Sequence, residues 1–147
     1  MVCYFIYEMI TLTKIFRFES AHAIHGYPGA CSNIHGHSYE LHVSVADKQG
    51  GENFIDGMGI VMDFKELKTI VQESVICKLD HTLILSQATL KSMPGIPQDK
   101  MIRFEYEPTA ENLLIFIRNE ITKSLPEHVQ LTALRLWETR DSYAEWS

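Results

Sequence analysis

Two histidines separated by a single glycine, His35 and His37, have the spacing in this chain that most directly suggests chemistry. Alternate side chains of an extended segment point the same way, so both imidazoles would lie on one face of a strand. A third imidazole, from His22 on a neighbouring strand, would complete a three-histidine metal site with one position open, as in catalytic zinc centres. Cys31 is near enough in sequence to serve this site without being a ligand.

Two predicted strands must position these residues. Residues 11–19 alternate in polarity and lead directly to His22. Residues 35–45 place His35 and His37 in the same phase as the apolar side chains of Tyr39, Leu41, Val43 and Val45. The histidines therefore continue an inward face. Residues 25–30 carry the glycines and the proline of a loop that delivers Cys31 to the second strand.

The rest of the chain predicts two helices and two more strands. Asp63 is the expected N-cap of an amphipathic helix that reaches about Lys78, and Thr109 caps a second helix that Pro126 ends. Residues 131–139 and 142–146 alternate again, and residues 101–106 could add a short edge strand. The order ββααββ predicts an α+β fold, a four-stranded antiparallel sheet with two helices on one face.

Composition narrows the class of protein. With 13 Lys and Arg against 19 Asp and Glu, the net charge of −6 argues against a nucleic-acid surface. The odd cysteine count argues against a disulfide framework and favours a reducing cytosol. The apolar opening is interrupted by Glu8 and is too short for a membrane span. We expect residues 1–8 to be an extension and residues 9–147 to form a single domain.

Six short motifs in register resemble those of the tetrahydropterin synthases, from about Met9 to the end of the chain. They are His22, the run Cys31 to His37, residues 59–64, residues 79–81, residues 108–112 and Glu138-Thr139. Three residues separate Cys31 from His35, which is similar to the carboxy-type branch of the family; the pyruvoyl-type branch usually has five.

The resemblance implies a tunnelling fold, in which trimers join their sheets into a barrel and two trimers stack as a homohexamer. Active sites then lie between subunits. The implied substrate is 7,8-dihydroneopterin triphosphate, a small pterin. The implied products are 6-carboxy-5,6,7,8-tetrahydropterin, acetaldehyde and triphosphate, formed in queuosine biosynthesis.

The resemblance also implies a role for each site residue. Zinc would be held by His22, His35 and His37, and Cys31 would act as general base. Asp80 would orient His81 as a proton-relay pair that serves the cysteine of a neighbouring subunit. Glu138 would anchor the guanidine-like edge of the pterin through two parallel hydrogen bonds.

The sequence is also compatible with other roles for these residues and for the whole chain. Cys31 could be a fourth zinc ligand or a small hydrophobic residue, and Glu138 could form a rim salt bridge with Arg135 or Arg140. The chain could be a 6-pyruvoyl-type synthase, or a non-catalytic protein that binds zinc and pterin. Other residues are assigned structural roles: His25, His42, His128, Cys3 and Cys77, with Thr109 and Glu111 as helix-start residues. No motif selects triphosphate contacts among Lys14, Arg17, Lys65 and Arg103.

Overall fold

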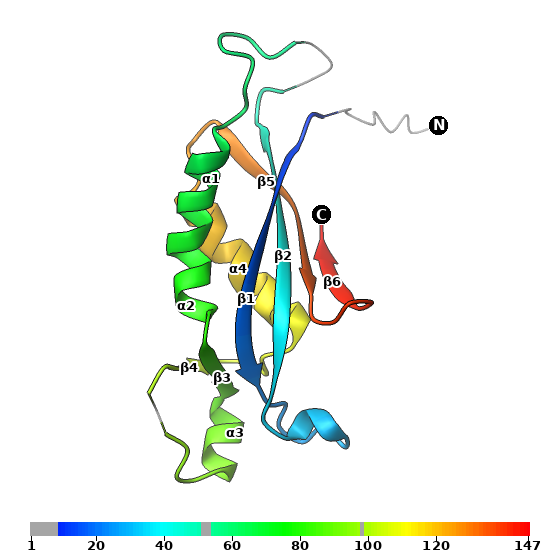
Figure 1. Ribbon diagram of the computed structural model, residues 1–147, viewed down its shortest axis with the longest axis vertical. Helices are drawn as coiled ribbons and strands as arrows, with labels where there is room; N and C mark the ends of the chain where they lie inside the picture. The colour runs from blue at the N-terminus through cyan, green and yellow to red at the C-terminus, as the bar shows by residue number, and fades with distance from the viewer. Residues whose placement is uncertain (1–8, 51–53, 98) are drawn as a thin grey trace, which may run out of the picture.

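The computed structural model describes residues 9–50, 54–97 and 99–147, and its strands form a single sheet (Figure 1). The extension predicted over residues 1–8, including Cys3, lies outside the described residues. The strands are β1 (Leu12–His22), β2 (His35–Asp47), β3 (Thr82–Ser86), β4 (Met101–Phe104), β5 (Val129–Trp137) and β6 (Tyr143–Trp146). The helices are α1 (Phe64–Val71), α2 (Cys77–Leu79), α3 (Gln87–Ser92) and α4 (Ala110–Ser124); a π-helical segment, Gln72–Ile76, joins α1 to α2, and Ala30–Ser32 form a 3-10 turn.

The centre of the sheet is the long antiparallel pair of β1 and β2. Its register places His22 opposite His35 and Phe18 opposite Tyr39. In β2 the predicted inward phase is buried and the other phase is more exposed; in β1 the phase of Phe16, Phe18 and His22 is the buried one. The alternation in the sequence therefore identified the correct inner face of β2.

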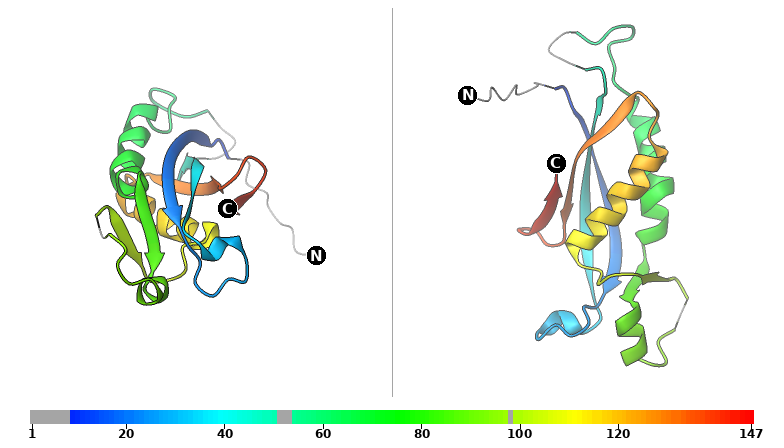
Figure 2. Two further views of the ribbon diagram at one scale, coloured as in Figure 1. Left: turned by 60° about the horizontal axis from the view of Figure 1, so that its bottom comes forward. Right: turned by 180° about the vertical axis from the view of Figure 1, so that it is seen from behind.

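The helices cover that inner face. In the right-hand view of Figure 2, seen from behind, α4 crosses in front of the strands and α1 runs along their side. Apolar residues of both helices join those of the inner sheet face in one hydrophobic core. The predicted caps are confirmed, because the Asp63 side chain accepts a hydrogen bond from the Lys65 backbone N at 2.7 Å and Thr109 Oγ1 accepts one from the Asn112 N at 3.2 Å. Among the described helices, none is both long and apolar enough to cross a membrane.

The predicted four-stranded antiparallel sheet is wrong in strand number and in direction. The sheet has six strands in the order β4-β3-β1-β2-β5-β6, and the β1–β3 and β3–β4 pairs are parallel. The sequence pattern did not predict β3, a short run buried on both faces that shows no alternation, or the short helix α3, where a connection was expected. The short edge strand that residues 101–106 could form is confirmed as β4. Because β3 lies beside β1, the turn before it comes close to the end of β1 that carries His22.

Candidate active site

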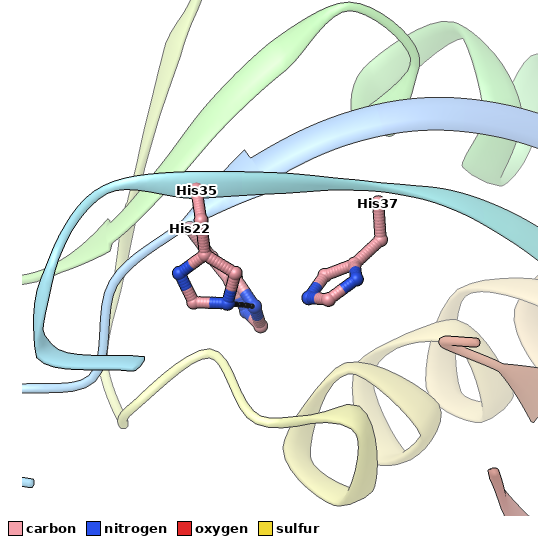
Figure 3. Close-up of side chains that lie close together, drawn as sticks. All are labelled: His22, His35 and His37. Carbon is pink, nitrogen blue, oxygen red and sulfur yellow. Dashed lines mark hydrogen bonds between the residues drawn. The ribbon is translucent and has the colours of Figure 1, made fainter. Parts of the chain in front are cut away.

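The three predicted metal ligands come together at the ends of β1 and β2. One ring nitrogen from each of His22, His35 and His37 lies within 4.8 Å of the others. Figure 3 shows the rings of His35 and His37 leaving β2 on the same side, with the ring of His22 reaching them from β1. Among the described residues, this is the one cluster of three or more His, Cys, Asp or Glu side chains with metal-ligand spacing. The strand register therefore builds the site that the i, i+2 spacing predicts.

The hydrogen bonds of two of these rings determine which nitrogen faces the cluster. His22 Nδ1 donates to the carbonyl O of Pro108 at 2.6 Å, and His35 Nδ1 donates to the carbonyl O of Asn33 at 2.8 Å, since a carbonyl only accepts. In the neutral rings both Nε2 atoms then carry lone pairs, although they lie 3.1 Å apart. Two facing lone pairs at this distance require a shared proton or a cation between them.

A metal ion fits this donor set. Tetrahedral zinc with Zn–N bonds of 2.0–2.1 Å places ligand nitrogens about 3.3 Å apart, close to the His22–His35 separation. The Nε2 atom of His37 is buried and has no hydrogen-bond partner among the described residues, although it faces the same space. Second-shell carbonyls that fix the ring tautomer are typical of metal-binding histidines.

Burial also favours the ligand-competent form of two rings. Only 3% of the surface of His22 is exposed, and this burial lowers its pKa despite the opposing effect of the Pro108 carbonyl. Burial likewise lowers the pKa of His37, against the opposing attraction of the Glu138 carboxylate. Both rings therefore favour the neutral state that binds metal.

Cys31 lies beside this cluster but does not belong to it. It is half-buried within the 3-10 turn Ala30–Ser32 and lines a cavity of about 540 Å³ together with His22 and Glu138. Since the thiol lies outside the group of converging ligand nitrogens, the arrangement leaves the fourth metal position open. A molecule in the cavity would contact the open side of the histidine cluster and the thiol together.

Glu138 follows β5 and faces the histidines. Its Oε1 lies 3.8 Å from His37 Nε2, and its Oε2 accepts a hydrogen bond from Tyr39 Oη at 3.5 Å. The Tyr39 side chain is 1% exposed, and this burial, with the Glu138 carboxylate adding to it, strongly raises its pKa. The predicted alternative of a salt bridge to Arg135 is not observed, because the guanidinium Nε of Arg135 donates to Glu145 Oε2 at 2.6 Å.

Asp80 and His81 form the predicted pair, but neither lines the cavity that contains Cys31. His81 Nδ1 lies 3.0 Å from Asp80 Oδ1, and the His81 side chain is 68% exposed. His81 has a φ of 55°, a left-handed conformation that is rare outside glycine. Its backbone N donates to the Glu19 carbonyl at 2.6 Å, while the Glu19 N donates to Asp80 Oδ1 at 2.9 Å.

The surroundings of His81 place it on the other side of the sheet. It lines a second cavity, of about 390 Å³, with Glu19 and Ser38. Both of these belong to the outward phases of β1 and β2, although Ser20 and His37 of the inward phases also line this cavity. The cavity lined by His81 and the cavity lined by Cys31 have no lining residue in common.

The structure adds residues that the sequence did not assign to the site. Thr109 and Glu111, predicted only as helix-start residues, line the cavity with Cys31, as does Tyr27. Tyr39 continues the alternation of His35 and His37, and this phase was the available signal for its place beside Glu138. Nothing in the sequence identified the Pro108 carbonyl as the partner of His22, because the contact joins residues far apart in the chain.

The fold and the site define an α+β protein with one mixed sheet and a buried three-histidine cluster. The chain belongs to the 6-pyruvoyl tetrahydropterin synthase family, whose family model matches residues 11–147. It is 30% identical to a 6-carboxy-5,6,7,8-tetrahydropterin synthase of Haemophilus influenzae over 145 residues, which covers 94% of this chain and 99% of the relative. A protein of the same name from Rickettsia typhi is 32% identical over 142 residues, covering 93% and 99%. The family resemblance predicted from the motifs is therefore confirmed.

Solved structures agree with the fold. A 6-pyruvoyltetrahydropterin synthase of Plasmodium vivax superposes with a TM-score of 0.75 at 19% identity, covering 95% of this chain and 97% of that one. The corresponding enzyme of Caenorhabditis elegans gives a TM-score of 0.69 at 20% identity, covering 95% and 96%. At sequence identities of 19% and 20%, the structural similarity supports a shared fold and nothing more.

Proposed function

We propose that this chain is a zinc-dependent lyase that converts 7,8-dihydroneopterin triphosphate to 6-carboxy-5,6,7,8-tetrahydropterin, acetaldehyde and triphosphate, with consumption of water. The observation that carries this function is the cavity where an open three-histidine cluster, a thiol and a carboxylate meet. The names of the relatives and the three-residue spacing between Cys31 and His35 support the carboxy-type product over the pyruvoyl type.

His22, His35 and His37 would hold the zinc ion. Zinc bound there would supply Lewis-acid chemistry, by lowering the pKa of side-chain hydroxyls and polarising a developing carbonyl. Cys31, at the wall of the same cavity, would take a carbon-bound proton from the substrate side chain. A free thiol with a pKa of about 8.5 is mostly protonated at neutral pH, so this role needs a nearby cation or an acid-base partner.

Asp80 and His81 would provide that acid-base partner from a neighbouring subunit. The contact to Asp80 fixes the orientation of the His81 ring and leaves Nε2 as the nitrogen that exchanges protons. The exposure of this ring and its separation from Cys31 within the chain support an active site between subunits of a trimer or hexamer. Each chain would then contribute a zinc–thiol half to one site and a relay half to another.

Glu138 would bind the pterin. Its carboxylate lies in the wall of the cavity, where it can accept two parallel hydrogen bonds from the 2-amino group and N3–H of the ring. Tyr39 and His37 contact opposite oxygens of this carboxylate and so restrict its orientation. The Glu138 side chain is 28% exposed, and hydrogen bonds from a bound pterin would compensate for the hydration that its carboxylate has lost.

Product analysis tests this function. Purified zinc-loaded protein is incubated with 7,8-dihydroneopterin triphosphate, and acetaldehyde and the pterin product are followed by chromatography and mass spectrometry. Acetaldehyde together with a 6-carboxy-tetrahydropterin is the expected result and would support a role in queuosine biosynthesis. Release of triphosphate without acetaldehyde would assign the chain to the pyruvoyl type. Absence of turnover by a folded, zinc-bound oligomer would favour the alternative of a non-catalytic protein that binds zinc and pterin.

A further inference from the structure

Glu107 lies between β4 and α4, and its contacts reach two other parts of the site. Its side-chain Oε2 accepts a hydrogen bond from the backbone N of His25 at 2.8 Å. Its carbonyl O accepts hydrogen bonds from the backbone N of Thr109 at 2.8 Å and from Asn112 Nδ2 at 2.9 Å. The residue thus fixes the start of α4 with its backbone and holds the loop after β1 with its side chain.

The loop that Glu107 holds is the one that carries Cys31. His25 follows Ile24, whose backbone N donates to the carbonyl O of Cys31 at 2.8 Å. Within the loop, Ser32 also bonds to Gly29, through its backbone N at 3.1 Å and its Oγ at 2.8 Å. These bonds hold residues 24–32 together as a compact unit. A shift of His25 would therefore also move Cys31.

The residue after Glu107, Pro108, contacts the three-histidine cluster. The Pro108 carbonyl accepts the 2.6 Å hydrogen bond from His22 Nδ1, and proline restricts the backbone at this point because its ring fixes φ. One dipeptide therefore bonds to a metal ligand through Pro108 and to the cysteine loop through Glu107. The side chain of His25 makes a separate and longer contact, between Nδ1 and Ser92 Oγ at 3.5 Å.

We propose that Glu107 is a positioning residue that holds Cys31 at a fixed place relative to His22. A carboxylate that accepts from a backbone N–H forms a stronger bond than a neutral acceptor does, which suits a residue that must hold an exposed loop. Its effect on turnover rests on the proposed function, whereas its effect on the thiol can be measured without substrate.

The test compares Glu107→Met, which keeps the side-chain length but has no oxygen acceptor, with Glu107→Gln, which keeps one. Glu107→Ala serves as a second variant without an acceptor, and Glu105→Ala removes an exposed carboxylate two residues earlier as a control. The full-length, zinc-loaded proteins are alkylated with iodoacetamide under native conditions. Peptide mass spectrometry then gives the rate at Cys31 relative to that at Cys77, an exposed thiol that serves as internal reference.

We expect Glu107→Met and Glu107→Ala to raise the relative alkylation rate of Cys31 by at least about fivefold, from the loss of one charge-assisted hydrogen bond. Glu107→Gln should stay within about twofold of wild type because an amide oxygen can still accept the bond. The Glu105→Ala variant should match wild type. In the enzyme assay, Glu107→Met should lower kcat with a smaller effect on KM.

An unchanged Cys31 rate in Glu107→Met and Glu107→Ala would overturn this role, even if both variants melt at a lower temperature, because a purely structural residue would give that pattern. A Glu107→Gln variant as reactive as Glu107→Met would overturn the hydrogen-bond mechanism. Failure of wild type to turn over the pterin would count against the proposed function alone, since the alkylation rates would still report on the loop.

Discussion

The Nε2 atoms of His22 and His35 lie 3.1 Å apart, while Nδ1 of each ring donates to a backbone carbonyl. The two residues are direct cross-strand partners at the ends of β1 and β2, so the sheet register alone brings the rings together. Because the carbonyls leave both Nε2 atoms as acceptors, the pair is complete only with a cation or a shared proton. The buried Nε2 of His37 beside them favours a metal ion.

Replacing one histidine should release the metal. We expect wild type to bind one zinc ion per chain and His22→Ala to bind it more than about 100-fold more weakly, since even second-shell changes cost 10–100-fold. The matched control is His42→Ala, because His42 lies on the outward phase of β2 and contacts Glu40 instead. Zinc content after gel filtration measures the stoichiometry, and competition with a chelator measures the affinity. Equal zinc retention by the two variants would contradict the three-histidine site.

Removing the Tyr39 hydroxyl should loosen Glu138. In Tyr39→Phe the ring still stacks on Phe18, 5.0 Å away between centroids, so the core keeps its packing. The carboxylate loses a partner 3.5 Å away, and we expect KM for the pterin to rise by about threefold to tenfold with zinc content unchanged. Steady-state kinetics measure this effect. A variant that loses zinc but keeps KM would show that Tyr39 supports the metal cluster instead.

Mixed oligomers should recover activity from two inactive variants. Since Cys31 and His81 line separate cavities of one chain, Cys31→Ala and His81→Ala should damage different halves of the proposed intersubunit site. Refolding equal amounts together should restore activity in about one quarter of the sites, as expected for random assembly of a symmetric oligomer. The control is the double variant refolded with Cys31→Ala, which can form no intact site. Absence of recovery in verified mixed oligomers would place the whole site within one chain.

Asp80 should contribute to stability in a defined pH range. The Glu19 backbone N–H, and to a smaller extent His81, lower the pKa of Asp80 in the folded protein. A lowered folded pKa means that the contribution is present above the unfolded value of about 3.9 and is lost as the pH falls through the folded value. We expect the melting temperature of wild type to fall more steeply below about pH 4 than that of Asp80→Asn.

The size of this effect should be small, because the Asp80 side chain is 39% exposed and water screens its interactions. A difference of at most about 2 °C between the two proteins is expected. Thermal melts from neutral to acidic pH measure it, with buffers of constant ionic strength. Parallel curves for wild type and Asp80→Asn would show that the Glu19 and His81 contacts do not stabilise the charged carboxylate.

The histidine cluster was predictable because it depends on local rules. The i, i+2 spacing of His35 and His37 puts both rings on one strand face, and the apolar phase of β2 identifies that face as the inner one. Asp63 and Thr109 were recognised as caps by equally local signals. These assignments needed no knowledge of which segments meet in space.

The remaining features depend on contacts between distant segments. The strand β3 has no alternation because both of its faces are covered, so its sequence could not distinguish it from a loop or a helix end. Its parallel pairing with β1 brings the preceding turn against Glu19, and this contact holds His81 on the outward side of the sheet. The hydrogen bond from His25 to Glu107 likewise joins segments that no sequence pattern relates.

Zinc content and acetaldehyde formation, measured together in Cys31→Ala, test the proposed active site most directly. If Cys31 lies beside an open three-histidine centre and acts as the base, the variant should keep one zinc ion per chain and its oligomeric state. It should then form no acetaldehyde above background from 7,8-dihydroneopterin triphosphate. Loss of zinc from Cys31→Ala would make the thiol a metal ligand, and undiminished acetaldehyde release would remove it from the reaction; either result contradicts the proposed site.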